Sequence, residues 1–162
     1  MKKIVLLLLL PFLCGSCWPT DNRNFNEPQY KAVIIDRSVL ENSIAIQNAR
    51  PISTSGKIYI KDNLMFVNDV NKGFHVYDYS DPKNPIQIQF ITAPGATDLA
   101  IRNDALYINQ AVDLVTATYD QATKKLVVNN RNRNVFPQKQ APNGLYGYTK
   151  DNEIIIDWTL IK

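Results

Sequence analysis

The sequence predicts a mainly β protein made of propeller-like blades, each a four-stranded antiparallel sheet. Short apolar segments alternate with turn residues through most of the 162-residue chain. One group of four such segments is followed by a second group at an offset of 41 residues, and only one short segment has helical spacing. Four short strands repeated at about 40 residues are typical of propeller blades.

The first repeat, residues 52–91, contains four segments with the pattern of β-strands. The turn between the first two is Asp62-Asn63, whose side chains tolerate the positive φ of a two-residue hairpin loop. Pro82 and Pro85 place a loop before the fourth segment, because proline cannot donate to a β-ladder. The predicted strands are 57–61, 64–68, 74–78 and 86–91.

The second repeat, residues 92–128, copies the first less closely. Residues 65–68 (Met-Phe-Val-Asn) fall on residues 106–109 (Leu-Tyr-Ile-Asn) at the repeat offset. The proline-containing loop is replaced by Thr-Tyr-Asp-Gln-Ala-Thr at 118–123. The predicted strands are 98–102, 105–109, 113–118 and 124–128.

The segment before the repeats, residues 30–51, predicts a strand followed by a helix. Residues 31–36 form a short apolar run suited to a strand. Ser38 and Glu41 have the spacing of a capping box, in which each side chain satisfies an exposed amide of the other residue. Apolar residues at helical spacing follow, so we expect one helix over 38–48.

The segment after the repeats contains a long loop and a closing strand. Residues 129–152 are rich in Asn, Arg, Gln, Pro and Gly, and a loop this long in a compact domain is usually functional or poorly ordered. Residues 153–161 predict a strand. Its apolar face is expected to carry Ile154, Ile156, Trp158 and Leu160.

Two blades leave the predicted fold with open sheet edges. Propellers typically have about four to eight blades, and open edges expose unpaired amides that promote aggregation. Three arrangements satisfy this constraint. The strands at 31–36 and 153–161 can cover the edges, which is the arrangement we favour. Copies can associate to complete a ring, or the chain can be a shortened relative of a longer protein.

One predicted strand and the loop after it resemble a motif of a known family. Residues 74–85, Phe-His-Val-Tyr-Asp-Tyr-Ser-Asp-Pro-Lys-Asn-Pro, resemble the LVIVD repeat of bacterial and archaeal surface proteins. The chain is more closely similar to LVIVD-containing lipoproteins of Bacteroidetes-type bacteria, over roughly residues 30–128. The resemblance implies a propeller-like fold, and it implies no defined activity.

The N-terminus has the pattern of a lipoprotein signal peptide. Two lysines precede the apolar run 4–13, which is about half the length of a membrane-spanning helix and suits a signal-peptide core. The small residues Gly15 and Ser16 before Cys17 predict cleavage there and lipidation of Cys17. An ordinary secretory signal with two incidental cysteines is the alternative. A redox Cys-x-x-Cys is disfavoured because no βαβ pattern surrounds it.

Cleavage before Cys17 divides the chain into three parts. Residues 1–16 are the signal peptide, residues 17–29 a polar tether, and residues 30–162 a single β-rich domain. Without the two N-terminal lysines the chain has 16 basic and 15 acidic residues, so its charge does not favour nucleic acid as a partner. Trp18 stands where an inner-membrane retention signal often has Asp. We therefore expect a lipid anchor in the outer membrane, with the face undetermined.

No catalytic, metal or cofactor site is expected from the titratable residues. His75 is the only histidine, and a zinc site needs three or four ligands, so we predict a structural or surface role. The aspartates do not form the alternating pattern of a calcium loop, and Asp78 and Asp81 are expected to accept hydrogen bonds from turn amides. The aspartates considered are Asp62, Asp69, Asp78, Asp81, Asp98, Asp104, Asp113 and Asp120.

The long loop has the composition of a ligand-binding surface. Its tyrosines, arginines and amides suit stacking on sugar faces and hydrogen bonding to hydroxyls; the alternative is a connector whose aromatic residues cover the core. The candidate ligand-facing residues are Arg131, Arg133, Phe136, Tyr146 and Tyr148.

The expected function is a non-enzymatic binding or scaffolding module of the cell envelope, with a protein or glycan partner and an undetermined oligomeric state. One alternative is an extracellular hydrolase that uses carboxylates such as Asp151 and Asp157. The other is a shortened family member with little independent function.

Overall fold

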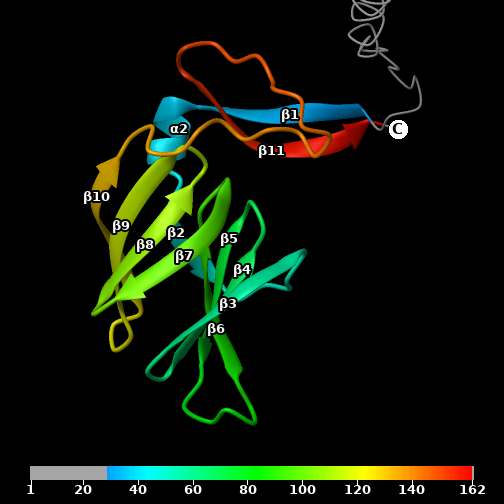
Figure 1. Cartoon of the computed structure of the whole chain (residues 1–162). Coiled ribbons are helices and arrows are strands. Elements are labelled where there is room, and N and C mark those ends of the chain that lie inside the picture. Colours follow the sequence, from blue (N-terminus) through cyan, green and yellow to red (C-terminus); the bar gives the residue numbers. More distant parts are fainter. Residues whose placement is uncertain (1–28, 162) are drawn as a thin grey trace, which may run out of the picture.

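The structure is a computed structural model that describes residues 29–161. It is mainly β, with three antiparallel sheets, none of them closed (Figure 1). The predicted signal peptide and lipidated Cys17, like most of the predicted tether, lie outside the described residues.

The first sheet contains the first repeat. Its strand order is β2-β6-β5-β4-β3, so the four predicted strands form an antiparallel meander and β2 extends it at one edge. The Asp62-Asn63 turn forms as predicted, with Asp62 at φ 52°. The strands are β2 (Ala45–Asn48), β3 (Ser55–Lys61), β4 (Leu64–Asp69), β5 (Gly73–Asp78) and β6 (Ile86–Thr92).

The second sheet contains the second repeat. Its order is β10-β9-β8-β7, again a meander of the four predicted strands. Asn103, at the position equivalent to Asp62, also has φ 52°. The strands are β7 (Ala96–Arg102), β8 (Ala105–Gln110), β9 (Asp113–Asp120) and β10 (Lys125–Asn132).

The main core lies between these two sheets. Side chains from one face of each sheet are buried there, and Phe66 meets Tyr119 edge to face with ring centroids 6.2 Å apart. Along β8 and β9 buried and half-buried residues alternate strictly, which is the pattern of a sheet covered on one face. The second sheet therefore has one face on the core and one partly open to solvent.

The third sheet contains only β1 (Gln29–Asp36) and β11 (Glu153–Ile161) and lies across one end of the other two sheets (Figure 1). Both strands were predicted, but our expectation that they cover the edges of the blades is wrong, because they pair with each other. Apolar residues of β11 pack instead on Leu40 and Val112. This packing buries them at the end of the two larger sheets.

The predicted apolar face of β11 is only partly correct. The register between β1 and β11 shifts between Val33 and Ile34, and a bulge of this kind changes which side the following residues face. Ile154 and Ile156 pack toward the core. Trp158 instead lies beside Ile155, since an added Cβ at Gly147 would be 2.8 Å from both side chains.

The predicted helix over 38–48 is wrong beyond its first turn. Helix α2 (Arg37–Glu41) has five residues, and its N-cap, Asp36, makes no side-chain capping bond. The following residues form β2, in which Ile46 pairs with Ile91 of β6 and packs on the core. Pairing with a distant strand thus overrides the local helical spacing.

Candidate functional site

The five candidate residues of the long loop do not form one site. Arg131 belongs to β10, so the connecting segment is residues 133–152. Arg131 and Arg133 both contact Glu41 of α2. Phe136 is half-buried, and its backbone N–H donates to Val112 O at 2.9 Å. Tyr146 and Tyr148 are 74% and 90% exposed. The structure therefore separates a polar network from an aromatic surface.

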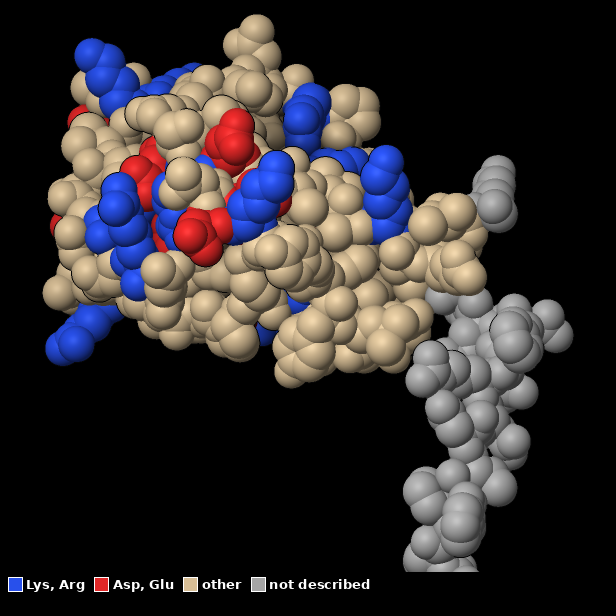
Figure 2. Space-filling view, turned by 90° about the horizontal axis from the view of Figure 1, so that it is seen from above, with Lys and Arg blue, Asp and Glu red and all other residues tan. Residues whose placement is uncertain are grey.

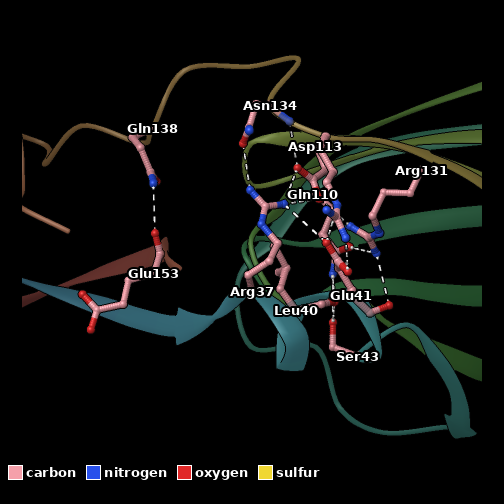
Figure 3. A network of polar contacts seen from close by, with 11 residues as sticks. Arg37, Leu40, Glu41, Ser43, Gln110, Asp113, Arg131, Asn134, Gln138 and Glu153 are labelled. Atoms are coloured by element: carbon pink, nitrogen blue, oxygen red, sulfur yellow. Dashed lines mark hydrogen bonds and ion pairs between the residues drawn. The ribbon is translucent and has the colours of Figure 1, made fainter. Parts of the chain in front are cut away.

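Asp113 is the centre of the polar network (Figure 3). Its side chain is fully buried, and Arg37 Nη1 lies 2.7 Å from both of its carboxylate oxygens. Arg131 Nη1 donates at 2.8 Å and the backbone N–H of Asn134 at 3.1 Å. Burial alone would raise the pKa of Asp113, but the hydrogen bonds from Arg37, Asn134 and Arg131 hold this pKa below its usual value. Asp113 is therefore a buried anion that links α2, β10 and the start of the segment 133–152.

Further polar contacts extend this network to β8 and to the residues that follow α2, and a separate contact lies near β11. Gln110 is fully buried; it accepts from Arg131 at 2.8 Å and donates to Ser43 Oγ at 2.9 Å. Gln138 Nε2 donates to the backbone O of Glu153 at 3.3 Å (Figure 3). The network around Asp113 therefore holds the start of the segment 133–152, and the separate contact of Gln138 holds this segment against β11.

A second buried carboxylate, Asp69, lies in the first sheet. It accepts hydrogen bonds from Ser53 Oγ at 2.7 Å and from the backbone N–H of Thr54 at 2.9 Å. Burial opposes ionisation, but these hydrogen bonds and that from His75 lower the pKa of Asp69 to about 2. Through these hydrogen bonds, Asp69 at the end of β4 links this strand to the segment before β3.

His75 is fully buried beside Asp69. Its Nε2 lies 3.3 Å from Asp69 Oδ2, and Gln87 Nε2 donates to its Nδ1 at 2.6 Å. These partners suit a neutral ring with its proton on Nε2. Burial lowers the pKa of His75, an effect that Asp69 partly opposes. The ring is sealed from solvent, so this Asp–His pair has the geometry of a structural contact.

The turn aspartates behave as predicted. Asp78 accepts hydrogen bonds from the backbone N–H and the hydroxyl of Ser80, and Asp81 accepts one from the backbone N–H of Lys83. Within residues 29–161, no cluster of three or more His, Cys, Asp or Glu side chains could hold a metal ion.

Tyr146, but not Tyr148, lines a groove of about 460 Å³ that we call the aromatic groove. None of its lining residues is charged. The residues that shape it are Tyr30, Ala141, Leu145, Tyr146, Gly147 and Trp158.

Trp158 and Gly147 form the rigid part of the aromatic groove. The indole Nε1 of Trp158 donates to the backbone O of Lys139 at 3.1 Å, which orients the ring. Gly147 packs directly on this ring, and any side chain there would come within 2.8 Å of it. Tyr146 extends from the neighbouring position into solvent. A preformed indole beside an exposed phenol suits stacking of a flat, uncharged ligand.

Charge is distributed unevenly over this end of the molecule. Figure 2 shows acidic and basic side chains interspersed on one part of the surface and a largely uncharged part toward the end where the described chain begins. Among the charged pairs at this end of the molecule, the guanidinium of Arg133 lies 2.7 Å from Glu41 of α2. Gln29, the first described residue, lines the aromatic groove. The groove thus lies where the chain leads back toward Cys17.

Sequence reasoning missed Trp158 and Tyr30 as groove residues and Asp69 and Asp113 as buried ionic centres. Trp158 was assigned to the core face by simple alternation, which the bulge in the β1–β11 pair breaks. The glycine between Tyr146 and Tyr148 was the available signal, since it marks a place where an aromatic ring packs on the backbone.

Within the described part of the chain, no helix has the length and apolar character needed to cross a membrane.

No protein-family model, no curated protein and no solved structure matches this chain.

Proposed function

We propose that this protein is a lipid-anchored, non-enzymatic module of the bacterial cell envelope, in the outer membrane, that binds a neutral carbohydrate in the aromatic groove. The observation that carries the proposal is an uncharged groove with an oriented indole, located where the described chain begins at Gln29. Gln29 is twelve residues after Cys17, the predicted lipid attachment site. In this arrangement the module presents its groove close to the membrane surface.

The chemistry of the aromatic groove favours a sugar over an ionic ligand. Aromatic faces stack on the apolar faces of pyranose rings, and backbone and amide groups can pair with hydroxyls. The lining contains two amide side chains and no charged group, so a charged ligand would lose its hydration there without gaining an ion pair. A neutral glycan therefore fits this lining better than an anionic one.

We also infer that the two four-stranded sheets are propeller-like blades of the LVIVD type. The repeat offset of 41 residues and the matching meander order support this inference, as does the motif at 74–85. The LVIVD resemblance supplies no activity, so it is compatible with a binding module.

The rival hydrolase is less well supported. Glycoside hydrolysis uses two carboxyl groups about 5–10 Å apart. Asp151 lies in the turn before β11, and Asp157 lies four residues after the first residue of that strand, which corresponds to roughly 13 Å of extended strand. Asp157 also accepts a hydrogen bond from Asn71 at 2.5 Å. These two carboxylates therefore do not form a catalytic pair.

Lipidation is tested by metabolic labelling with an alkyne fatty acid. We expect the wild-type chain to carry the label, and Cys17→Ser to lose it and to keep the uncleaved N-terminus, because no thiol remains at the cleavage site. Cys14→Ser is the matched control and should be labelled normally. If Cys17→Ser keeps the label, or if only Cys14→Ser loses it, Cys17 is not the lipid attachment site.

Ligand binding is tested with a panel of neutral and acidic glycans and the tryptophan fluorescence of the chain from residue 19 onward, in which Trp158 of the groove is the one tryptophan. We expect a neutral glycan to change the emission. Tyr146→Ala should weaken binding about tenfold, as expected for loss of one aromatic stack. Tyr148→Ala is the matched control, because Tyr148 is more exposed and lies outside the groove lining. Equal loss in both variants, or binding of acidic glycans only, would contradict the proposal.

A further inference from the structure

We propose that the end of the molecule around the aromatic groove docks on a lipid bilayer, the same bilayer that would hold the anchor at Cys17. Docking rests on the anchor of the proposed function, and it does not depend on the proposed glycan. The observations that carry it are the exposed apolar side chains at this end, the packed backbone beneath them, the position of the charges and the place where the described chain begins.

The two-stranded sheet of β1 and β11 has one face toward the other two sheets and one face away from them. Ile154 and Ile156 of β11 pack toward the core. Trp158 of the same strand and Tyr30 of β1 instead line the aromatic groove. Leu160 pairs with Tyr30 in register, and directly paired residues lie on the same face of a sheet. The groove and Leu160 therefore share the face that points away from the main core.

Large apolar and aromatic side chains are exposed around the aromatic groove. Leu145 and Tyr146 of the segment 133–152 are 64% and 74% exposed, and Tyr148 of the same segment is 90% exposed. Leu160 of β11 is 57% exposed. We call these four residues the apolar rim. Tyrosine is favoured where water meets lipid, because its ring is apolar and its hydroxyl is polar, so this composition fits a bilayer surface.

The apolar rim is presented by a packed backbone. Ile155 in the middle of β11 is fully buried and lies against Gly147, which holds the segment 133–152 on the sheet. Ala141 N donates to Leu145 O at 2.9 Å, and Gly144 N donates to Ala141 O at 2.8 Å, which closes the turn before Leu145. This part of the backbone is already ordered in the free protein, so docking does not have to pay for ordering it.

Charged groups point away from the apolar rim. Lys31 lies between two groove residues of β1 and therefore points to the opposite face of the sheet. Lys139 Nζ donates to Asn71, and Asp157 accepts a hydrogen bond from the same asparagine at 2.5 Å. Figure 2 shows the largely uncharged surface at this end. Contact with lipid there requires no charge to leave water, which is the costly step at a bilayer.

The described chain begins at this same end of the molecule. Gln29 lines the aromatic groove and pairs with Ile161 at the end of β11, and it follows Cys17 by twelve residues. Twelve residues span at most about 40 Å, so a lipid on Cys17 would hold the apolar rim near the bilayer. A few side chains then suffice for docking, because the tether raises their effective concentration. The groove would face the bilayer, and the proposed glycan would be one carried at the membrane surface.

The test couples the chain to vesicles through Cys17, the one cysteine in residues 17–162. A maleimide lipid in phosphatidylcholine vesicles reacts with this thiol, at few chains per vesicle, so the result does not depend on lipidation in the cell. Trp18→Phe leaves Trp158 as the one tryptophan, and lipids with a nitroxide on the headgroup quench tryptophan at the bilayer surface. We expect several times more quenching of Trp158 in the coupled chain than in uncoupled chain mixed with vesicles whose maleimide is blocked.

Two substitutions and a matched control locate the contact. Leu145→Asp and Leu160→Asp place a carboxylate on the apolar rim from two different segments, and each should reduce the quenching severalfold, because a charge resists leaving water. Ile86→Asp is the control. Ile86 is 59% exposed and begins β6, after a loop that lies at the opposite end of the molecule from β1 and β11 (Figure 1), so this variant should dock as the unsubstituted chain.

The outcomes separate docking from the other proposals. These vesicles carry no sugar, so a failure of the proposed glycan leaves the quenching unchanged, and chemical coupling makes it independent of the anchor formed in cells. All three substituted positions are exposed, so circular dichroism should be the same in every variant. An unquenched Trp158 in the coupled chain would overturn the proposal and leave another occupant, such as residues 19–28 or a second copy. Quenching that is equal in all three variants would overturn it as well.

Discussion

Replacing Asp113 by Asn is expected to lower the free energy of unfolding by about 3–5 kcal/mol, because it removes one partner of a buried ionic cluster. The carboxylate is fully buried, and it accepts hydrogen bonds from Arg37 and Arg131, whose side chains are only 17% and 11% exposed. In the variant both guanidinium groups stay in the interior without the charge that compensates them.

Urea unfolding of the two proteins measures this loss. Asp104→Asn is the matched control, because Asp104 is exposed in the turn between β7 and β8 and such a surface change should stay within about 0.5 kcal/mol. Asp113→Asn also weakens the contact of the Asn134 backbone N–H with residue 113, near the start of the segment 133–152. Proteases should therefore cut this segment faster in Asp113→Asn than in the wild type. Equal stability of the two variants would show that Asp113 does not hold the fold together.

Acid is expected to destabilise the protein in two stages, through His75 and then through the buried aspartates. The pKa of Asp69 is about 2, below its ordinary value of 3.8. A carboxyl whose folded pKa is lowered stabilises the fold above its unfolded pKa, and this contribution is lost as pH falls from about 4 to about 2. For Asp69 alone the loss is about 2 kcal/mol, and Asp113 acts in the same direction.

His75 produces the earlier stage. Burial lowers its pKa below the ordinary value of 6.5, so the unfolded chain takes up a proton at a pH where the folded chain does not. The free energy of unfolding therefore begins to fall as pH drops below about 6.5. Since His75 is the only histidine, His75→Gln should remove this stage and leave the decline below about pH 4 in place.

Urea unfolding from pH 8 down to pH 2 measures both stages in the wild type, in His75→Gln and in Asp69→Asn. Asp104→Asn again serves as the control and should follow the wild-type profile. A stability that stays constant, or that increases, as the pH falls from 7 to 2 would contradict the assignment of buried, hydrogen-bonded anions at Asp69 and Asp113.

The hairpins of both repeats could be predicted because their information is local. Alternating side chains and the Asp62-Asn63 turn determine where the strands begin and reverse, and the same pattern recurs at Asn103-Asp104. The predicted helix over 38–48 failed for the opposite reason. Ile46 has a better partner in Ile91 of β6, and the local pattern carries no information about that pairing.

The sites could be predicted only in part. The exposed Tyr146 and Tyr148 were predicted as candidates, but the groove also needs Tyr30 and Trp158, more than 120 residues apart in the chain and joined by the β1–β11 pair. Asp69 and Asp113 resembled ordinary turn aspartates. Their burial depends on residues from other segments, such as Arg37, whose approach no local pattern indicates.

The sequence by itself determined the β-strands of the two repeats, their turns and the repeat of 41 residues, because each of these depends on neighbours along the chain. Only the tertiary structure decided that β1 pairs with β11 across the end of the other two sheets, that two aspartates are buried with distant arginines, and that the two larger sheets pack on each other through one face each. These features depend on which surfaces exclude water from one another, and that depends on residues far apart in the sequence.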